Sequence, residues 1–176
     1  MGIEQRLVQN KEKVLRQWFD MLAGTYPLET VGLLKKETNQ FANPVGHTFL
    51  VAIDEIVDEF LGRNSVEAMG PMLDKVIRIR AIQDFSPSSS LAFIFGLKTI
   101  ALEVLEEDLA AGAVSREELS DFERKVDALA LSAFDVYMRC RENLFEVRMN
   151  EIKNRTNRLL KRAEIKKSTL NEVGSE

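Results

Sequence analysis

The feature that most constrains the fold is a long helical pattern in the last third of the chain. It begins at Ser115, where a serine followed three residues later by Glu118 forms the capping-box pattern of a helix start. From there to about Lys167 the sequence contains neither glycine nor proline. Such a run predicts one uninterrupted helix.

This predicted helix carries apolar side chains on two sides. One series recurs at spacings of three and four residues and consists of Leu119, Phe122, Val126, Leu129, Ala133, Val136, Cys140, Leu144 and Val147. A second series consists of Leu131, Phe134, Met138, Phe145, Met149 and Ile152. At about 100° per residue the two series lie roughly 145° apart around the helix axis. A helix that packs against one layer needs a single apolar stripe, so we expect one side to face the chain's own core and the other a second chain.

The composition is that of a globular all-α protein. The 176 residues are 45% hydrophobic and 30% charged, with only four prolines, and the apolar residues recur at helical rather than alternating intervals. This length suits one domain with a buried core. We therefore expect a helical domain over residues 1–165 and a flexible tail over residues 166–176.

Membrane insertion and secretion are not expected. The longest stretch without charge, Phe85 to Leu97, covers about 13 residues, whereas a bilayer span needs roughly 20. The N-terminus lacks the apolar region of a secretory signal, which predicts a cytoplasmic protein.

The single cysteine, Cys140, lies in the first apolar series, so we expect it to pack in the core.

The charges are distributed unevenly. Residues 1–152 carry 17 basic and 25 acidic side chains, net −8, and residues 153–176 carry seven basic and three acidic, net +4. A basic end could contact nucleic acid or an anionic surface. Because it is short and lacks aromatic residues, a solvated helix end is the favoured interpretation, and no nucleic acid partner is expected.

Five helices are expected in all. Their approximate ranges are 3–23, 44–61, a third helix ending near residue 85, 87–111 and 115–167. Asn43-Pro44 and Ser86-Pro87 are strong helix starts, and Gly24 is a stop. The polar stretch Lys35 to Gln40 predicts a loop with at most one short helical turn. Gly70-Pro71 either kinks the third helix or marks its beginning.

The sequence offers little for catalysis or metal binding. His47 is the only histidine, which excludes the usual zinc and di-iron ligand sets, and it lies off the apolar stripe of its helix near Asp54 and Asp58. We interpret it as a surface residue and expect neither enzyme activity nor a cofactor. The helix start at Ser86 to Ser90 could hold an anion, although simple capping is the favoured interpretation.

A small ligand pocket is the alternative that the residues leave open. Arg78 and Arg80 are unusually polar for a segment that leads into a buried helix. They could line a pocket together with Trp18, or they could tie the third helix to its neighbours. Structural tethering is the favoured interpretation of the two.

Several segments together resemble the RsbRD N-terminal domain family. They are the Trp18 helix, Tyr26-Pro27, the stretch from Phe41 to Gly46, the run from Ile77 to Ser88, the stretch from Phe93 to Lys98, and Ala133 to Tyr137 followed by Arg141-Glu142. The resemblance covers about residues 5–160. Its most specific elements are the run that begins at Ile77 and the Phe-Asp-x-Tyr element with the Arg-Glu pair that follows.

The resemblance implies an N-terminal sensory domain of an RsbT co-antagonist, a component of bacterial stressosome signalling. It further implies a globin-like helical fold that lacks haem, dimerises and leads through its last helix to a phosphorylatable STAS domain. No STAS-like βαβ pattern follows the final helix in this sequence. Stressosome core assembly and phosphorylation, which depend on that domain, are therefore not expected of these residues.

The sequence as a whole predicts a non-enzymatic sensor or protein-interaction module with a globin-like bundle of about five helices and a long C-terminal helix. We expect a homodimer formed by the second stripe of the long helix together with the first helix. A STAS-domain or other signalling protein is the further partner considered. The alternative is an accessory protein that binds a small molecule or cofactor in the helical interior.

Overall fold

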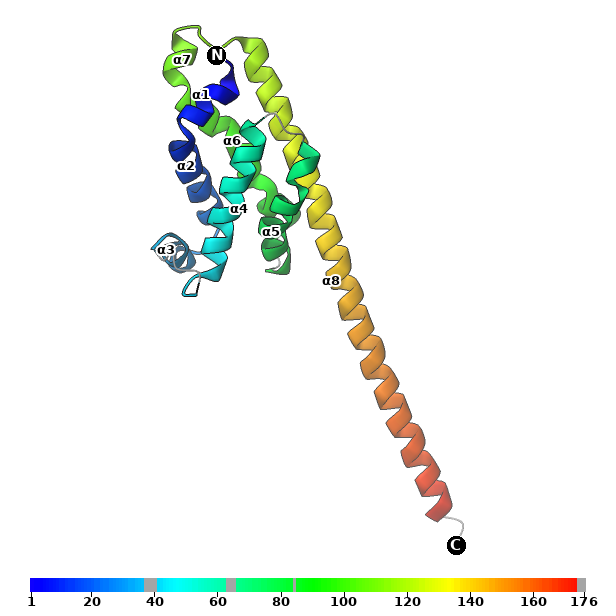
Figure 1. Ribbon diagram of the computed structural model, residues 1–176. Coiled ribbons are helices and arrows are strands. Elements are labelled where there is room, and N and C mark those ends of the chain that lie inside the picture. Colours follow the sequence, from blue (N-terminus) through cyan, green and yellow to red (C-terminus); the bar gives the residue numbers. More distant parts are fainter. Residues whose placement is uncertain (37–40, 63–65, 84, 174–176) are drawn as a thin grey trace. The chain divides into compact units, whose positions relative to one another are not determined.

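The computed structural model describes residues 1–36, 41–62, 66–83 and 85–173, and it is an all-α helical bundle (Figure 1). No strand occurs in these residues. The helices are α1 (Ile3–Gln9), α2 (Lys11–Ala23), α3 (Leu28–Lys36), α4 (Pro44–Leu61), the 3-10 turn η1 (Val66–Met69), α5 (Gly70–Ile82), α6 (Pro87–Val104), α7 (Glu106–Ala110) and α8 (Arg116–Val173). The expectation of an all-α fold with a long C-terminal helix is confirmed.

The chain forms two compact units, and each is described by itself. The first unit is Met1–Cys140 and the second is Arg141–Glu176. The first unit holds α1 to α7 and the beginning of α8, whereas the second holds the remainder of α8. Helical structure continues to Val173, and residues 174–176, the end of the expected tail, lie outside the described residues.

Three helix starts follow the expected local chemistry. The Asn43 side chain accepts a hydrogen bond from the Gly46 amide at 2.9 Å, and Pro44 occupies the first turn of α4. Ser86 caps α6 in the same way, with Pro87 in its first turn. At the start of α8 the Ser115 hydroxyl accepts from the Glu118 amide at 3.1 Å, while the Glu118 carboxylate accepts from the Ser115 amide at 2.8 Å. The predicted capping box is therefore present.

Removing this capping box should weaken the start of α8. We expect Ser115→Ala to lower the free energy of unfolding by about 1 kcal/mol, because the first turn then loses an acceptor for its free amides. Urea denaturation followed by circular dichroism measures this. Ser120→Ala, on an exposed position within the same helix, should leave stability unchanged or slightly higher. Equal losses in both variants would contradict a capping role.

Several helix boundaries differ from the sequence-based expectation. The first predicted helix is divided at Asn10 into α1 and α2, and the fourth is divided at Leu105 into α6 and α7. Helix α3 was not among the expected helices, and its last two residues belong to the stretch Lys35 to Gln40 that was predicted to be a loop; residues 37–40 of that stretch are outside the described residues. Helix α5 begins at Gly70, directly after η1, so Gly70-Pro71 marks a beginning and not a kink.

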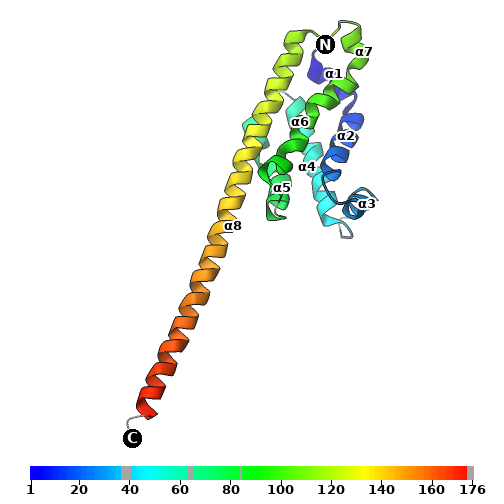
Figure 2. The same cartoon turned by 180° about the vertical axis from the view of Figure 1, so that it is seen from behind.

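The core of the first unit lies between α2, α4, α5 and α6, with α2 packed against both α4 and α6 (Figure 2). Its largest fully buried side chains include Trp18, Phe49 and Phe60. The approach of α2 to α6 is close at Gly96, because a Cβ atom there would overlap the Met21 sulfur. A larger residue at this position would therefore require the flexible Met21 side chain to move.

The first part of α8 closes the core of the first unit. Phe122 packs edge-to-face on Phe60 of α4, with ring centroids 5.6 Å apart. In this unit the first apolar series is buried except for Leu119, which is partly buried; the buried members are Phe122, Val126, Leu129, Ala133, Val136 and Cys140. The side of α8 that was expected to face the chain's own core therefore does so within this unit.

Two polar contacts fix the direction of α8 relative to α6. The Tyr137 hydroxyl donates to the Phe85 carbonyl oxygen at 2.7 Å, just before α6 begins. Lys98, later in α6, forms an ion pair of 2.7 Å with Asp127, earlier in α8. Since the earlier residue of one segment pairs with the later residue of the other, the two helices run antiparallel.

In the described residues, no helix is apolar over a length that would carry it across a bilayer.

Candidate functional site

An exposed apolar face extends over α6 and the first part of α8. It is formed by Phe95 of α6 and by Leu131, Phe134 and Met138 of α8, and we call it the α6–α8 face. Their side chains are 47%, 69%, 42% and 39% exposed, respectively. Large apolar side chains gathered in this way are uncommon on a monomeric surface and indicate an interaction site.

The antiparallel pairing of the two helices brings these side chains together. Phe95 lies one turn before Lys98, and Leu131 lies one turn after Asp127, the ion-pair partner of Lys98. Both therefore lie on the same side of that ion pair and on neighbouring turns of adjacent helices. Phe134 and Met138 continue the face along α8, because residues three and four apart share one side of a helix.

Charges of both signs border the α6–α8 face. The Lys98 ammonium lies 5.9 Å from the centre of the Phe95 ring in addition to pairing with Asp127. Asp135 and Arg139 are exposed on the same stretch of α8. A border of mixed sign can meet a second copy of itself without net repulsion, as an isologous interface requires.

Sequence periodicity found the α8 part of this face but not the α6 part. Leu131, Phe134 and Met138 were predicted to lie off the core, and they are exposed. Phe95 belongs to a helix in which nearly every turn is apolar, so periodicity does not distinguish it from its buried neighbours. The exposed positions Ala92, Phe95 and Leu102 recur at helical spacing, a signal that the neighbouring apolar residues conceal.

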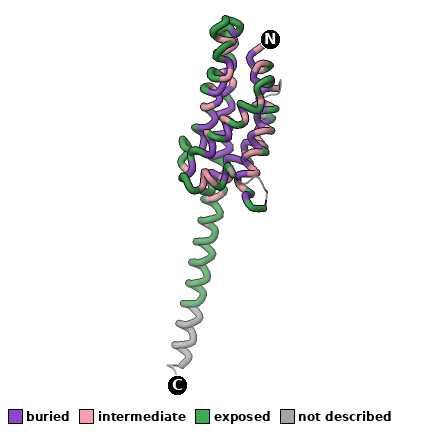
Figure 3. Tube along the Cα trace, turned by 90° about the vertical axis from the view of Figure 1, so that its left-hand side faces the viewer, coloured by how far each residue is buried: buried purple, intermediate pink, exposed green. Residues whose placement is uncertain are grey.

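The remaining members of the second series lie in the second unit. Phe145 and Ile152 are exposed, and Met149 is partly buried. Figure 3 shows α8 as largely exposed from residue 141 to the last residue whose burial is described. In the first series, Val147 is also exposed. In this unit, therefore, both predicted stripes include exposed side chains.

Trp18 packs on Phe93 in the core. The indole nitrogen of Trp18 donates to the Phe93 carbonyl oxygen at 2.7 Å, and the two rings lie 5.6 Å apart. A void elsewhere in the core, lined by side chains of α1, α2, α4, α6 and α8 but not by Trp18, has a volume of about 10 Å³, which is at most the space of one water molecule. These contacts give no direct support to a ligand at Trp18, and that alternative stays a prediction.

Arg80 is fully buried and joins three helices. Its guanidinium donates to the Thr25 hydroxyl at 2.9 Å, directly after α2, and to the Ser89 carbonyl oxygen of α6 at 2.7 Å. Its Cζ atom lies 4.3 Å from the centre of the Phe85 ring and 5.3 Å from that of Tyr26. These contacts match the favoured interpretation, in which this residue ties its helix to neighbouring helices.

The pKa of Arg80 reflects this environment. Burial lowers the pKa of the guanidinium, and the adjacent Tyr26 partly opposes that effect. An arginine nevertheless stays protonated in a protein. Stacking on aromatic faces compensates in part for the lost hydration of the charge.

Arg78 does not join this cluster. It is exposed and pairs with Asp74, one turn earlier in α5, at 2.8 Å. Trp18 and Arg80 both approach Phe93, since the Arg80 Cζ atom lies 5.9 Å from the centre of its ring. Of the three residues considered for a pocket, the structure thus brings two together.

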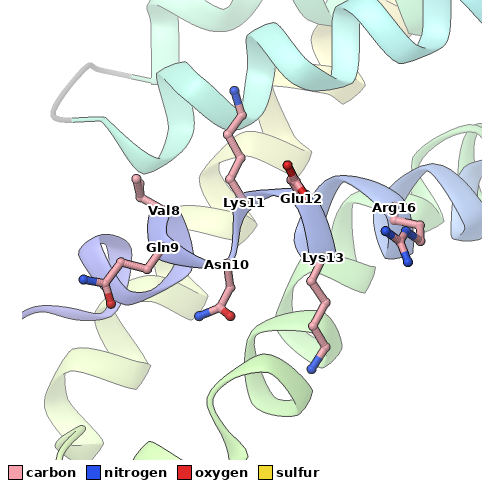
Figure 4. A pocket seen from close by; sticks show the side chains of 7 residues that line it. All are labelled: Val8, Gln9, Asn10, Lys11, Glu12, Lys13 and Arg16. Atoms are coloured by element: carbon pink, nitrogen blue, oxygen red, sulfur yellow. The ribbon is translucent and has the colours of Figure 1, made fainter.

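A surface hollow at the α1–α2 junction lacks convergent side chains. Figure 4 shows the side chains of Lys11 and Lys13 pointing in opposite directions from this junction. Lys11 instead reaches α4, where it pairs with Asp54 at 2.8 Å and Asp58 at 2.5 Å. Hydrogen bonds to these two carboxylates raise the pKa of Lys11. The acidic cluster on α4 thus has a structural partner.

The remaining candidate residues occupy structural positions. His47 is partly exposed in the first turn of α4. Cys140 is buried with its sulfur 3.8 Å from an oxygen of Asp74, and burial raises the pKa of its thiol, which favours the unreactive protonated form. Within the described ranges, no group of three or more His, Cys, Asp or Glu side chains could hold a metal ion.

The fold and this site together describe an all-α domain with an uncovered apolar face on two antiparallel helices. The chain belongs to the RsbT co-antagonist protein rsbRD N-terminal domain family, whose family model matches residues 12–152. The resemblance that its sequence motifs indicated is therefore confirmed.

A relative is found in Archaeoglobus fulgidus. It is an uncharacterized protein that is 26% identical over 143 residues, and the match covers 81% of this chain and 84% of that protein. No solved structure matches the chain. The globin-like character expected from the family resemblance consequently stays a prediction.

Proposed function

We propose that this chain is a non-enzymatic sensor and protein-interaction domain of stress signalling that forms a homodimer through the α6–α8 face. Family membership supports the signalling role, because the matching family consists of N-terminal domains of RsbT co-antagonist proteins. The exposed cluster of Phe95, Leu131, Phe134 and Met138 is the observation that carries the proposed interaction.

The chemistry of the α6–α8 face supports pairing with a second copy. Two-fold pairing is the commonest arrangement of soluble homo-oligomers, and it requires a surface that complements itself. Aromatic residues and methionine are enriched at the centre of such interfaces. Phe95, Phe134 and Met138 supply them here, and the border of mixed charge supplies the polar rim.

In our proposal α6, and not the first predicted helix, is the second contributor to the dimer. Val14, Trp18 and Leu22 of α2 are buried in the chain's own core, and Leu15 and Met21 are partly buried against it. They are thus unavailable to a second copy. Phe95 lies beside the α8 part of the face and takes that place in our proposal.

Charge introduced on the α6–α8 face should separate the dimer. We expect the wild-type chain to sediment as a dimer at tens of micromolar, and Phe134→Asp and Met138→Asp to sediment as monomers, because each buries a carboxylate in an apolar contact. Sedimentation velocity measures both states. Unchanged circular dichroism in the variants shows that the helices remain folded.

A matched control and the opposing outcomes complete this test. Leu28→Asp places the same charge on a leucine of α3 that is 90% exposed and away from the face, so it should remain dimeric. A monomeric wild type at tens of micromolar contradicts the dimer. A wild-type dimer that survives Phe134→Asp and Met138→Asp contradicts this location for the interface.

A further inference from the structure

The second unit carries an exposed heptad pattern on α8. Its apolar or small side chains recur at spacings of four and three residues, and they are Phe145, Met149, Ile152, Thr156, Leu159 and Ala163. We call this set the seam. All are exposed except Met149, which is partly buried. A strict alternation of this kind is the pattern of a helix that pairs along one narrow stripe, as in a coiled coil.

The positions that flank the seam are mostly basic. In heptad terms the seam occupies the a and d positions, and the flanking e and g positions are Glu146, Arg148, Lys153, Arg155, Leu160 and Arg162. Four of these six side chains are cations and one, Glu146, is a carboxylate. All six are exposed. These flanking positions govern which partner a coiled-coil helix accepts and in which orientation.

A second copy of the chain fits this seam poorly. In a parallel pair, a g position meets the e position of the following heptad. Arg148 of one copy would then face Lys153 of the other and Arg155 would face Leu160, so that Arg141 opposite Glu146 is the one attractive pair among these positions. In an antiparallel pair, g positions face g positions, so arginines would meet arginines. Like charges that face each other across an interface disfavour the pairing. The mixed border of the α6–α8 face lacks this difficulty.

We infer that the seam docks an amphipathic helix of a partner protein whose flanking positions carry Glu or Asp. Such a helix covers the apolar residues and at the same time places carboxylates opposite Arg148, Lys153 and Arg155. An anionic bilayer is a weaker match, because a helix that lies on a membrane presents a broad apolar face with its charges on the opposite side. Here the cations directly border a narrow stripe.

This inference is independent of the proposed homodimer. The α6–α8 face belongs to the first unit, and the seam belongs to the second. Phe134→Asp should therefore abolish the homodimer and leave binding at the seam intact. Failure of one proposal does not entail failure of the other.

A pair of synthetic peptides tests the inference on the full chain. Both peptides are about 28 residues long, with Ile and Leu at the a and d positions. One carries Glu at every e and g position, and the other carries Lys there. Each is labelled with a fluorophore and titrated with the protein, and fluorescence anisotropy reports binding. We expect the Glu peptide to bind and the Lys peptide to bind at least roughly tenfold more weakly.

Charge reversal at the flanks supplies the decisive variant. Arg148→Glu combined with Arg155→Glu should reverse the preference, so that the Lys peptide binds more tightly than the Glu peptide. Arg158→Glu combined with Lys161→Glu is the matched control, because it changes the net charge of the same helix equally at positions away from the seam. It should preserve the preference for the Glu peptide. Ile152→Asp should weaken Glu-peptide binding by at least roughly tenfold, because it places a charge within the apolar contact.

Four results would overturn the inference. The first is equal binding of the two peptides, or no binding of either. The second is an equal effect of the flanking and control charge reversals, which indicates general attraction between charges. The third is tighter binding to phosphatidylserine vesicles or to single-stranded RNA than to the Glu peptide. The fourth is complete disulfide formation by Ile152→Cys in a Cys140→Ser background without peptide, which shows that a second copy occupies the seam.

Discussion

Arg80→Ala is expected to lower the free energy of unfolding by about 3 to 5 kcal/mol. Arg80 is fully buried, so the shorter side chain leaves a cavity between α2, α5 and α6. The substitution also removes the donors to the Thr25 hydroxyl and the Ser89 carbonyl oxygen. Because Thr25 and Ser89 are themselves exposed, water can replace these donors in part, so the cavity is the larger contribution to the loss. Urea denaturation followed by circular dichroism measures the loss.

Two further variants separate the contributions to this loss. Arg80→Met retains much of the volume without the charge, and we expect a loss of about 1 to 2 kcal/mol, because buried charges replaced by apolar side chains of similar size are often tolerated. Arg80→Lys retains the charge but loses the planar fork that reaches two acceptors and stacks on Phe85. It should therefore be less stable than Arg80→Met.

Arg78→Ala is the matched control for these variants. Arg78 lies two residues from Arg80 on the same helix, but it is exposed and forms an ion pair with Asp74, a neighbour one turn away. An exposed pair of this kind contributes at most about 0.5 kcal/mol. If Arg78→Ala and Arg80→Ala were to lose the same stability, Arg80 would not be the link between three helices that its contacts indicate.

The helix starts could be predicted from the sequence because their chemistry is local. Asn43, Ser86 and Ser115 each accept a hydrogen bond from an amide three residues later in the chain. All residues of such a motif lie close together in the sequence, so the motif can be recognised from the sequence alone. The segment from Val76 to Arg80 alternates like a strand but lies in helix α5, as the wider helical spacing of the surrounding apolar residues indicates.

The helix breaks could not be predicted in the same way. Neither glycine nor proline marks Asn10 or Leu105, where the structure separates α1 from α2 and α6 from α7. Near both breaks the chain contacts segments that are distant in the sequence. Lys11 pairs with Asp54 and Asp58 of α4, and Leu105 is buried in the core. Such contacts depend on the assembled fold, which overrides local helix propensity.

Only the α8 part of the candidate site could be predicted from the sequence. The α8 portion followed from periodicity, since two stripes on one helix cannot both face the same neighbour. Phe95 was missed because α6 is apolar on most sides, so its apolar neighbours conceal the helical spacing of the side that α8 leaves uncovered. Its exposure depends on the antiparallel contact that Lys98 and Tyr137 establish with their partners. That contact joins residues far apart in the sequence.

Trp18→Ala is expected to cost about 3 to 5 kcal/mol of unfolding free energy, a loss comparable to that of Arg80→Ala. Trp18 is fully buried, its ring packs on Phe93, and its indole nitrogen donates to the Phe93 carbonyl oxygen. Alanine removes the largest side chain in the core and the donor together. Trp18→Phe restores much of the apolar volume but not the donor, and it should cost about 1 to 3 kcal/mol.

The same urea denaturation measures these losses, with Val8→Ala as the control. Val8 is 51% exposed on α1, so its loss should stay within about 0.5 kcal/mol. Because Trp18 and Arg80 approach Phe93 from two helices, the double variant Trp18→Ala, Arg80→Met should depart from the sum of the single losses by more than about 0.5 kcal/mol. Strict additivity would show that Phe93 does not couple the two residues, and that α2 and α5 are held to α6 independently.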